Sequence, residues 1–114
     1  MTPPSSPVPA IAWTDPARAA AFFAWLARVG TEHRLLVASL RPASSDASFR
    51  RYFRADREAG GTVIVMDAPP PQEDVRPFVH VAGLIAAAGL HGPRVLAADT
   101  QRGFLLLDDL GTQL

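Results

Sequence analysis

Apolar residues near the start of the chain recur at helical spacing. One stripe and its immediate flank hold five of them: Phe22, Phe23, Trp25, Leu26 and Val29. Asp15 has the place of an N-cap, Pro16 that of the first helical residue, and Gly30 that of a residue just past the end. This pattern predicts a helix over residues 15–29 whose apolar side packs into the core.

Three stretches then alternate between apolar and polar residues, which is typical of strands. They read "RLLVASLRP" from Arg34, "SFRRYFRAD" from Ser48 and "GTVIVMDAP" from Gly61. Glycines at 60 and 61 supply the turn between the last two stretches, because glycine accepts the positive φ of tight hairpins. We therefore expect an antiparallel meander of three strands.

A second helical pattern and two more apolar runs follow. The helical positions in "PQEDVRPFVHVAGLIAAAGL" are Val75, Phe78, Val79, Ala82, Ile85 and Ala86. Pro77 is tolerable only in the first turn, and Gly89 closes the helix. The runs Val95–Ala98 and Phe104–Leu107 read as strands joined by a polar turn at Asp99–Gly103. The predicted order is α-β-β-β-α-β-β, an α+β fold with a five-stranded antiparallel sheet.

Composition narrows the class of protein without naming a partner. The 114 residues suit one domain, and 48% hydrophobic residues with zero net charge suit a folded chain that does not attract nucleic acid or membrane as a whole. The absence of cysteine excludes thiolate metal sites. Residues 1–12 hold four prolines and neither a signal peptide nor a membrane span, so we expect a disordered tail and a cytoplasmic protein. All eleven cationic side chains are arginine.

The order of elements and four motifs together resemble a known family. The motifs are "SSDASFRRYFR", "VIVMDAPPPQED", "PFVHVAGLIAAAGLHGPRVLAAD" and "GFLLLDDLG", which span roughly Leu35 to Gly111. They resemble the N-terminal, nucleotide-binding lobe of the aminoglycoside-phosphotransferase family, whose fold is protein-kinase-like. More narrowly, they resemble the bacterial kinases that phosphorylate N-acetylmuramate and N-acetylglucosamine at the anomeric carbon in peptidoglycan recycling. Residues 13–114 would form this lobe.

The resemblance implies that the turn after the first strand covers the phosphates of ATP. Backbone amides and hydroxyls of Ser44, Ser45, Ala47 and Ser48 would bind the β- and γ-phosphates, whereas Asp46 would shape the turn, because a carboxylate repels phosphate. Taken without the resemblance, the same residues form an ordinary polar hairpin turn.

The second strand carries three arginines, and its alternation divides them between two faces. Phe49, Arg51 and Phe53 fall on one face and Arg50, Tyr52 and Arg54 on the other. We expect the two phenylalanines to pack in the core or over the adenine and Arg51 to point toward the nucleotide cleft. An RNA-binding interpretation of the arginines and aromatics is weaker, because no second basic element supports it.

The resemblance also shows a departure on the third strand. A typical kinase has a lysine there that contacts the phosphates and pairs with a glutamate of the next helix. The comparable residue is Met66 or an immediate neighbour, so Arg51 is expected to stand in for the lysine. Glu73 and Asp74 are interpreted as helix-start residues rather than as partners of a catalytic pair. The role of Asp67, an arginine or sugar contact, stays open.

The last strand would lead into the hinge that binds the adenine edge. By position Leu107 or Asp108 would supply the backbone contact, although an edge strand ending at Gly111 fits the same letters. In this family the catalytic base and the Mg²⁺ ligands come from a C-terminal lobe that carries an H-G-D motif. None of His33, His80 and His91 is followed by such a motif. We therefore expect a fragment of an amino-sugar kinase that binds ATP but is inactive alone.

Two alternatives stay open beside the kinase fragment. One is a stand-alone nucleotide-binding module without turnover, and the other is a protein-interaction domain. If a C-terminal lobe is absent, the helix at 15–29 and the strand Phe104–Leu107 should leave apolar surface uncovered, and self-association is expected.

Overall fold

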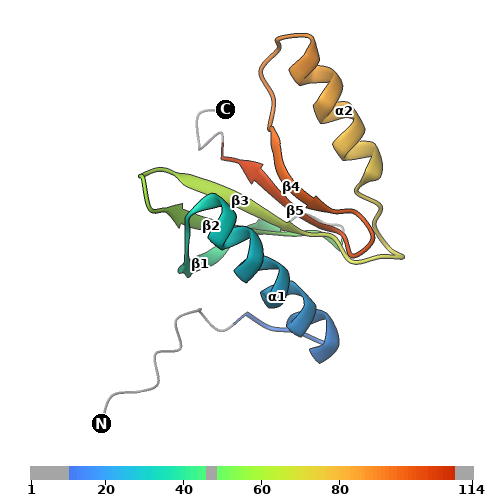
Figure 1. The fold of residues 1–114 in the computed structure, drawn as a ribbon. Coiled ribbons are helices and arrows are strands. Elements are labelled where there is room, and N and C mark those ends of the chain that lie inside the picture. Colours follow the sequence, from blue (N-terminus) through green and yellow to red (C-terminus); the bar gives the residue numbers. More distant parts are fainter. Residues whose placement is uncertain (1–10, 46–48, 110–114) are drawn as a thin grey trace.

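The computed structural model describes residues 11–45 and 49–109, which form two helices and one five-stranded sheet (Figure 1). Its elements in chain order are α1 (Pro16–His33), β1 (Leu35–Ser45), β2 (Arg51–Arg57), β3 (Thr62–Asp67), α2 (Arg76–Ala87), β4 (Val95–Asp99) and β5 (Phe104–Asp108). The strands lie in the order β1-β2-β3-β5-β4, and every neighbouring pair is antiparallel. The predicted α+β architecture is confirmed. β5 is an internal strand, so the alternative of an edge strand is excluded.

Helix α1 begins as predicted but ends later. The Asp15 carboxylate accepts a hydrogen bond from the Ala17 amide at 2.9 Å, and Pro16 opens the helix. Gly30 lies inside the helix and not beyond it. A Cβ at this residue would lie 2.7 Å from the Val37 side chain in β1. The glycine therefore permits close packing, and Arg34, with φ 55°, ends the helix.

Replacing Asp15 by alanine tests this helix start. The variant leaves the Ala17 amide without its side-chain acceptor, so we expect a loss of about 1 kcal/mol in the free energy of unfolding. Urea denaturation followed by circular dichroism measures it. Thr14→Ala is the matched control on an exposed neighbour, and an equal loss in both variants would contradict the cap.

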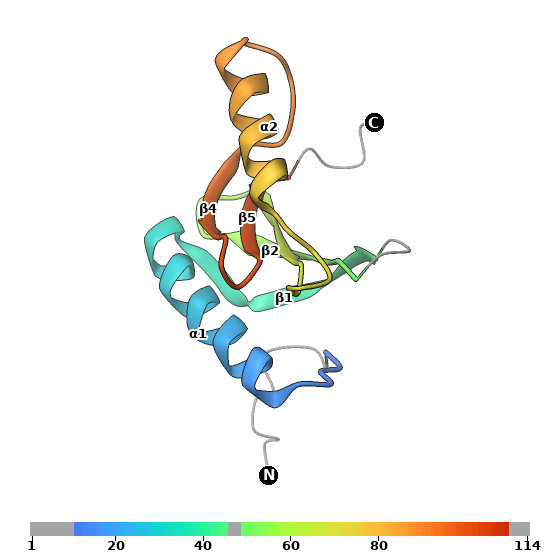
Figure 2. The ribbon, with the colours of Figure 1, turned by 90° about the vertical axis from the view of Figure 1, so that its right-hand side faces the viewer.

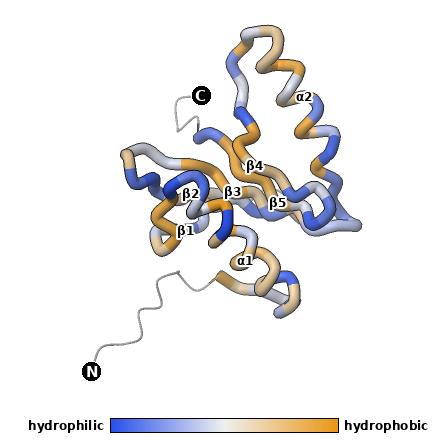
Figure 3. The backbone as a smooth tube through the Cα atoms, in the orientation of Figure 1, coloured by the Kyte–Doolittle hydropathy of each residue, from blue (hydrophilic) through white to orange (hydrophobic). Residues whose placement is uncertain are grey.

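The sheet lies between the two helices, and each helix covers one face of it (Figure 2). The α1 face holds the larger core, in which Phe22, Trp25, Leu26 and Val29 of α1 pack on Phe53, Val65, Phe104 and Leu106 of the strands. The α2 face holds a smaller cluster built from Met66, Val75, Leu105 and Leu107, with Tyr52, Ile64, Phe78, Val79 and Val95 at its border. Apolar residues accordingly run along the central strands in Figure 3. The pleat of β2, β3 and β5 thus sends alternate residues to two different environments.

Helix α2 has the predicted limits but less burial than its pattern suggests. Pro77 lies in the first turn, and Gly89, with φ 73°, follows the C-cap. Ala82 is the one buried residue of this helix, while Val81 and Leu84 are 51% and 57% exposed. The expected location of uncovered apolar surface is therefore wrong. The stripe of α1 and the residues of β5 from Phe104 to Leu107 are buried, and the large apolar side chains that are exposed lie elsewhere, on β1, before β2, and on and just after α2.

The two ends of the described chain bear on other expectations. Of the expected tail at 1–12, residues 1–10 lie outside the described residues, whereas Ile11 packs against the core and the Ala12 carbonyl accepts a hydrogen bond from Arg51. His33 is the last residue of α1. None of the described helices has the length and apolar character needed to cross a membrane.

Candidate functional site

A row of side chains crosses four strands on the α2 face of the sheet. Strand register pairs Ser44 with Tyr52, Tyr52 with Met66, and Met66 with Leu105. Residues paired across antiparallel strands project from the same face, so the row runs from an exposed serine at the end of β1 to the buried centre of the sheet. The row places Ser44 and Met66, two of the expected site residues, together.

Met66, which the sequence compares with the lysine of typical kinases, lies on the α2 face of the sheet. A lysine that pairs with the following helix has to project from the face that this helix covers, and Met66 does so. Its side chain is 1% exposed and packs with Val75, Leu105 and Leu107. An apolar cluster therefore replaces the usual ammonium–carboxylate pair at this position.

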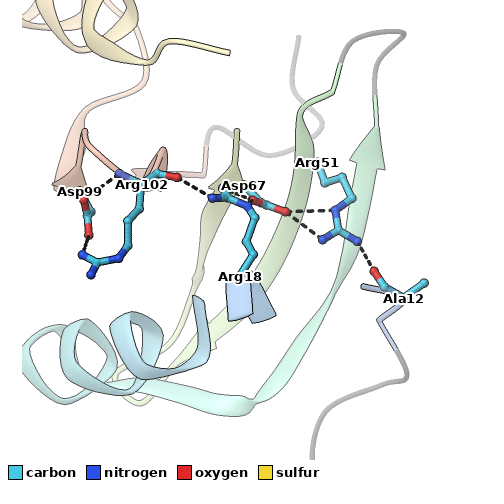
Figure 4. A network of polar contacts seen from close by, with 6 residues as sticks. All are labelled: Ala12, Arg18, Arg51, Asp67, Asp99 and Arg102. Carbon is cyan, nitrogen blue, oxygen red and sulfur yellow. Dashed lines mark hydrogen bonds and ion pairs between the residues drawn. The ribbon is translucent and has the colours of Figure 1, made fainter. Parts of the chain in front are cut away.

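Arg51 lies on the opposite face, which corrects the expected orientation. Its Nε and Nη2 donate to Oδ2 of Asp67 at 3.1 and 2.8 Å, and its Nη1 donates to the Ala12 carbonyl at 2.7 Å (Figure 4). The guanidinium also lies 4.3 Å from the centroid of the Trp13 ring. Phe53, on the same face, is buried as expected, but Phe49 is 62% exposed and packs in no core. Arg51 therefore belongs to the α1 side and does not stand in for the lysine.

Asp67 is the centre of this cluster on the α1 face. Asp67 is 2% exposed, and among the described residues it is the charged residue that is classed as buried. Arg18 of α1 donates to its Oδ1 from Nε at 2.9 Å and from Nη2 at 2.5 Å, and also donates to the Arg102 carbonyl at 2.7 Å (Figure 4). The carboxylate thus joins α1, β2, β3 and, through Arg18, the β4–β5 turn. Of the two roles left open for Asp67, the structure supports the arginine contact.

Arg50, which directly precedes β2, and Arg54 of β2 each pair with a residue distant in sequence. Arg50 Nε is 3.0 Å from Oε1 of Glu73, which precedes α2. Arg54 Nε donates to Oδ2 of Asp109 at 2.6 Å, and the Thr62 hydroxyl donates to the same oxygen. The hydrogen bond that Arg54 donates to the Asp109 carboxylate raises the pKa of Arg54 above its usual value. Glu73, interpreted from sequence as a helix-start residue, therefore fixes a cation of the sheet.

The backbone groups of Leu107 and Asp108, the residues expected at the hinge, take part in the sheet. Leu107 is paired with Ile64 on one side and Val95 on the other, inside the ladder. The Asp108 amide donates to the Arg94 carbonyl at 3.0 Å, so this N–H is already used. The Asp108 N–H is therefore used within the sheet, and the Arg54 and Thr62 side chains hold the carboxylate of the next residue, Asp109.

Part of the expected phosphate turn cannot be placed. Ala47 and Ser48 lie outside the described residues, as does Asp46, and Ser45 is paired with Arg51 at the end of β1. A cavity of about 570 Å³ opens nearby on the α1 face, between Trp13, Phe49, Arg51 and Pro70. It lies on the other side of the sheet from Met66.

The described residues do not fit a magnesium site. Within 11–45 and 49–109, no three or more histidine, aspartate or glutamate side chains gather as metal ligands. The buried carboxylate of Asp67 is occupied by two guanidinium groups, and His80 and His91 are exposed.

Comparison with known proteins agrees with this geometry. The sequence model of the phosphotransferase enzyme family matches residues 39–113. The N-acetylmuramate/N-acetylglucosamine kinase of Pseudomonas aeruginosa is 67% identical over 79 residues, which cover 67% of this chain and 22% of that protein. Kinases of the same name from Pseudomonas putida and Neisseria meningitidis serogroup B are 61% identical over 75 residues and 48% identical over 69 residues, covering 66% and 60% of this chain and 22% and 20% of those proteins. The match thus spans about a fifth of these relatives.

Proposed function

Because the chain belongs to the phosphotransferase enzyme family, we propose that it forms the ATP-binding lobe of a kinase that phosphorylates an amino sugar at its anomeric hydroxyl. The sugar class follows from the names of the relatives, which are 48–67% identical to this chain. The whole reaction would require the part of those relatives that this chain does not span. We place it in the cytoplasm, in the recycling of cell-wall sugars.

The observation that carries the proposal is the row Ser44–Tyr52–Met66–Leu105 on the face covered by α2. It joins the end of β1, where the phosphate-covering turn starts, to the strand that normally carries the phosphate-binding lysine. The same face continues over Leu107 to the end of β5, where the hinge begins. One face therefore presents the parts that a triphosphate and an adenine would contact.

We assign each part of this face a task. The amides and hydroxyls of Ser44, Ser45, Ala47 and Ser48 would bind phosphate oxygens, and Met66 and Leu107, which are buried in the α2-face cluster, would support the adenine side from beneath. Backbone groups at Asp108 and Asp109 would border the adenine edge, with Asp109 favoured because the Asp108 amide is used by Arg94. ATP supplies the phosphoryl group, whereas the base and Mg²⁺ ligands would come from outside this chain.

Titration of the ¹⁵N-labelled chain with ATP tests the proposal. We expect saturable amide shifts on the α2 face, at Ser44, Met66 and Asp109, and none in the α1 core at Phe22 or Val65. Saturation without phosphate transfer fits both a kinase lobe and a stand-alone module. These are separated by assaying a longer protein that contains this chain with N-acetylmuramate and N-acetylglucosamine, followed by ³¹P detection of an anomeric phosphate. No shift at millimolar ATP would contradict nucleotide binding and favour an interaction domain.

A further inference from the structure

We propose that Arg50, held by Glu73, is the cation that contacts the triphosphate in place of the absent third-strand lysine. The inference rests on the proposed function, since it names the residue that would perform one part of it. It differs from the sequence-based expectation, which gave this task to Arg51. The register of the sheet and the ion pairs of Arg50, Arg51 and Arg54 carry it.

Strand register brings Arg50 close to the place of the lysine. Arg51 is paired with Asp67 and Tyr52 with Met66, so Arg50 precedes the ladder opposite Ala68. Arg50 is therefore two residues from Tyr52, the partner of Met66, and directly precedes β2. Its Nε lies 3.0 Å from Oε1 of Glu73, so its side chain is held against the segment that leads from β3 to α2.

The pair also reproduces the connection that the lysine would make. In a typical kinase the cation joins the sheet to the helix that follows β3, through a glutamate. Here Glu73 comes from the segment between β3 and α2 and lies 3.0 Å from Arg50 Nε, with its own side chain 16% exposed. A guanidinium has five N–H donors in a fixed fork, so one group can hold a carboxylate and a phosphate oxygen together. Arg50 thus has the location, partner and donor geometry that the task requires.

The other arginines near this end of the sheet are committed elsewhere. Arg18 and Arg51 bind Asp67 on the α1 face, and Arg54, in the middle of β2, holds Asp109 beyond β5. Arg50 differs from these three arginines, because it lies at the start of β2 and is paired with the segment that leads into α2. A cation at that end meets phosphate, whereas one near Asp109 meets the adenine edge.

The competing interpretation is that the ion pair only fixes the segment before α2 against the sheet. A structural tie and a phosphate contact differ in what they do to ligands with and without phosphate. Loss of a tie would weaken ATP and adenosine binding alike. Loss of a phosphate contact would weaken ATP binding and leave adenosine binding unchanged.

The test measures dissociation constants for ATP and for adenosine by NMR titration of the 114-residue chain. We expect Arg50→Ala to weaken ATP binding about 10–100-fold, the effect of one charge-assisted hydrogen-bond donor, with adenosine binding unchanged. Arg50→Lys should restore part of the ATP affinity, and Glu73→Gln should weaken ATP binding less than Arg50→Ala does, because it frees the guanidinium without removing it. Arg76→Ala is the matched control: it removes an exposed arginine near Glu73, paired with Asp74, and should change neither constant.

Each outcome decides between the interpretations. An equal loss of ATP and adenosine affinity, or no loss of either, overturns the assignment to Arg50 while leaving ATP binding in place. Failure of the unchanged chain to bind ATP overturns the proposed function and this inference together. If Arg50→Ala does not fold, as judged by its amide spectrum, the ratio of the two constants in Arg50→Gln and Arg50→Lys gives the same decision.

Discussion

Replacing Asp67 by alanine is expected to lower the free energy of unfolding by about 3–5 kcal/mol, the usual result of removing one partner from a buried ion pair. The carboxylate is 2% exposed and accepts hydrogen bonds from both Arg18 and Arg51. Without it, two guanidinium groups would face each other beside the core, with no anion between them. Denaturation of the unchanged chain and of the Asp67→Ala variant in guanidinium chloride, followed by circular dichroism, measures the change in the free energy of unfolding from the midpoint and the slope.

The matched control removes an aspartate from an exposed pair. Asp56 pairs with Arg41 at 3.0 Å, and both side chains are more than two-fifths exposed. Asp56→Ala should cost less than about 1 kcal/mol, because water screens such pairs. A similar small loss for Asp67→Ala would contradict the role of Asp67 as the buried junction of α1, β2 and β3.

Replacing Gly103 by alanine is expected to destabilise the domain by about 2–5 kcal/mol, the sum of backbone strain and overpacking. Gly103 has φ 80° in the β4–β5 turn, where side-chain-bearing residues are strained. A Cβ there would lie 1.9 Å from the carbonyl oxygen of Ala68, so the backbone itself would have to move. That movement would also disturb the 2.8 Å hydrogen bond from the Ala68 amide to the Gly103 carbonyl. Thermal unfolding of the variant measures the loss.

Gly61→Ala separates the two contributions to that loss. Gly61 has nearly the same dihedral, φ 81°, but no atom lies within 4 Å of the Cβ that alanine would add. This variant should therefore show backbone strain alone, about 1–2 kcal/mol. Equal losses at Gly61 and Gly103 would contradict the close approach of the β4–β5 turn to Ala68.

Local patterns predicted the elements well because each depends on neighbours in sequence. The cap at Asp15, the positive φ of Gly60 and Gly61, and Pro77 in the first turn of α2 all agree with the structure. Gly30 was misinterpreted because a helix-ending glycine and a close-packing glycine look the same in sequence. The neighbour that makes the difference, Val37, is brought to Gly30 by the packing of β1 against α1.

The candidate site likewise has features that the local pattern predicted and features that it could not predict. Alternation in β2 correctly separated Arg51 and Phe53 from Tyr52 and Arg54, because the pleat has a period of two residues. It could not say which group α2 would cover, since that depends on the path of the chain between β3 and α2. The arginine assigned to the cleft was therefore the one on the α1 face. Arg50 carried no local signal of its partner, because Glu73 lies on the far side of β3 in the sequence.

By itself, the sequence determined the order of the elements, the α+β class and the family of this protein, because caps, turns and motifs are encoded within a few residues. The tertiary structure alone decided that Asp67 binds two arginines and that Glu73 holds a third. It also decided that the β5 ladder uses the Asp108 amide. The physical reason is that these contacts join segments whose separation in space is set by the register of the strands and the side of the sheet on which each helix packs. Periodicity fixes neither of these.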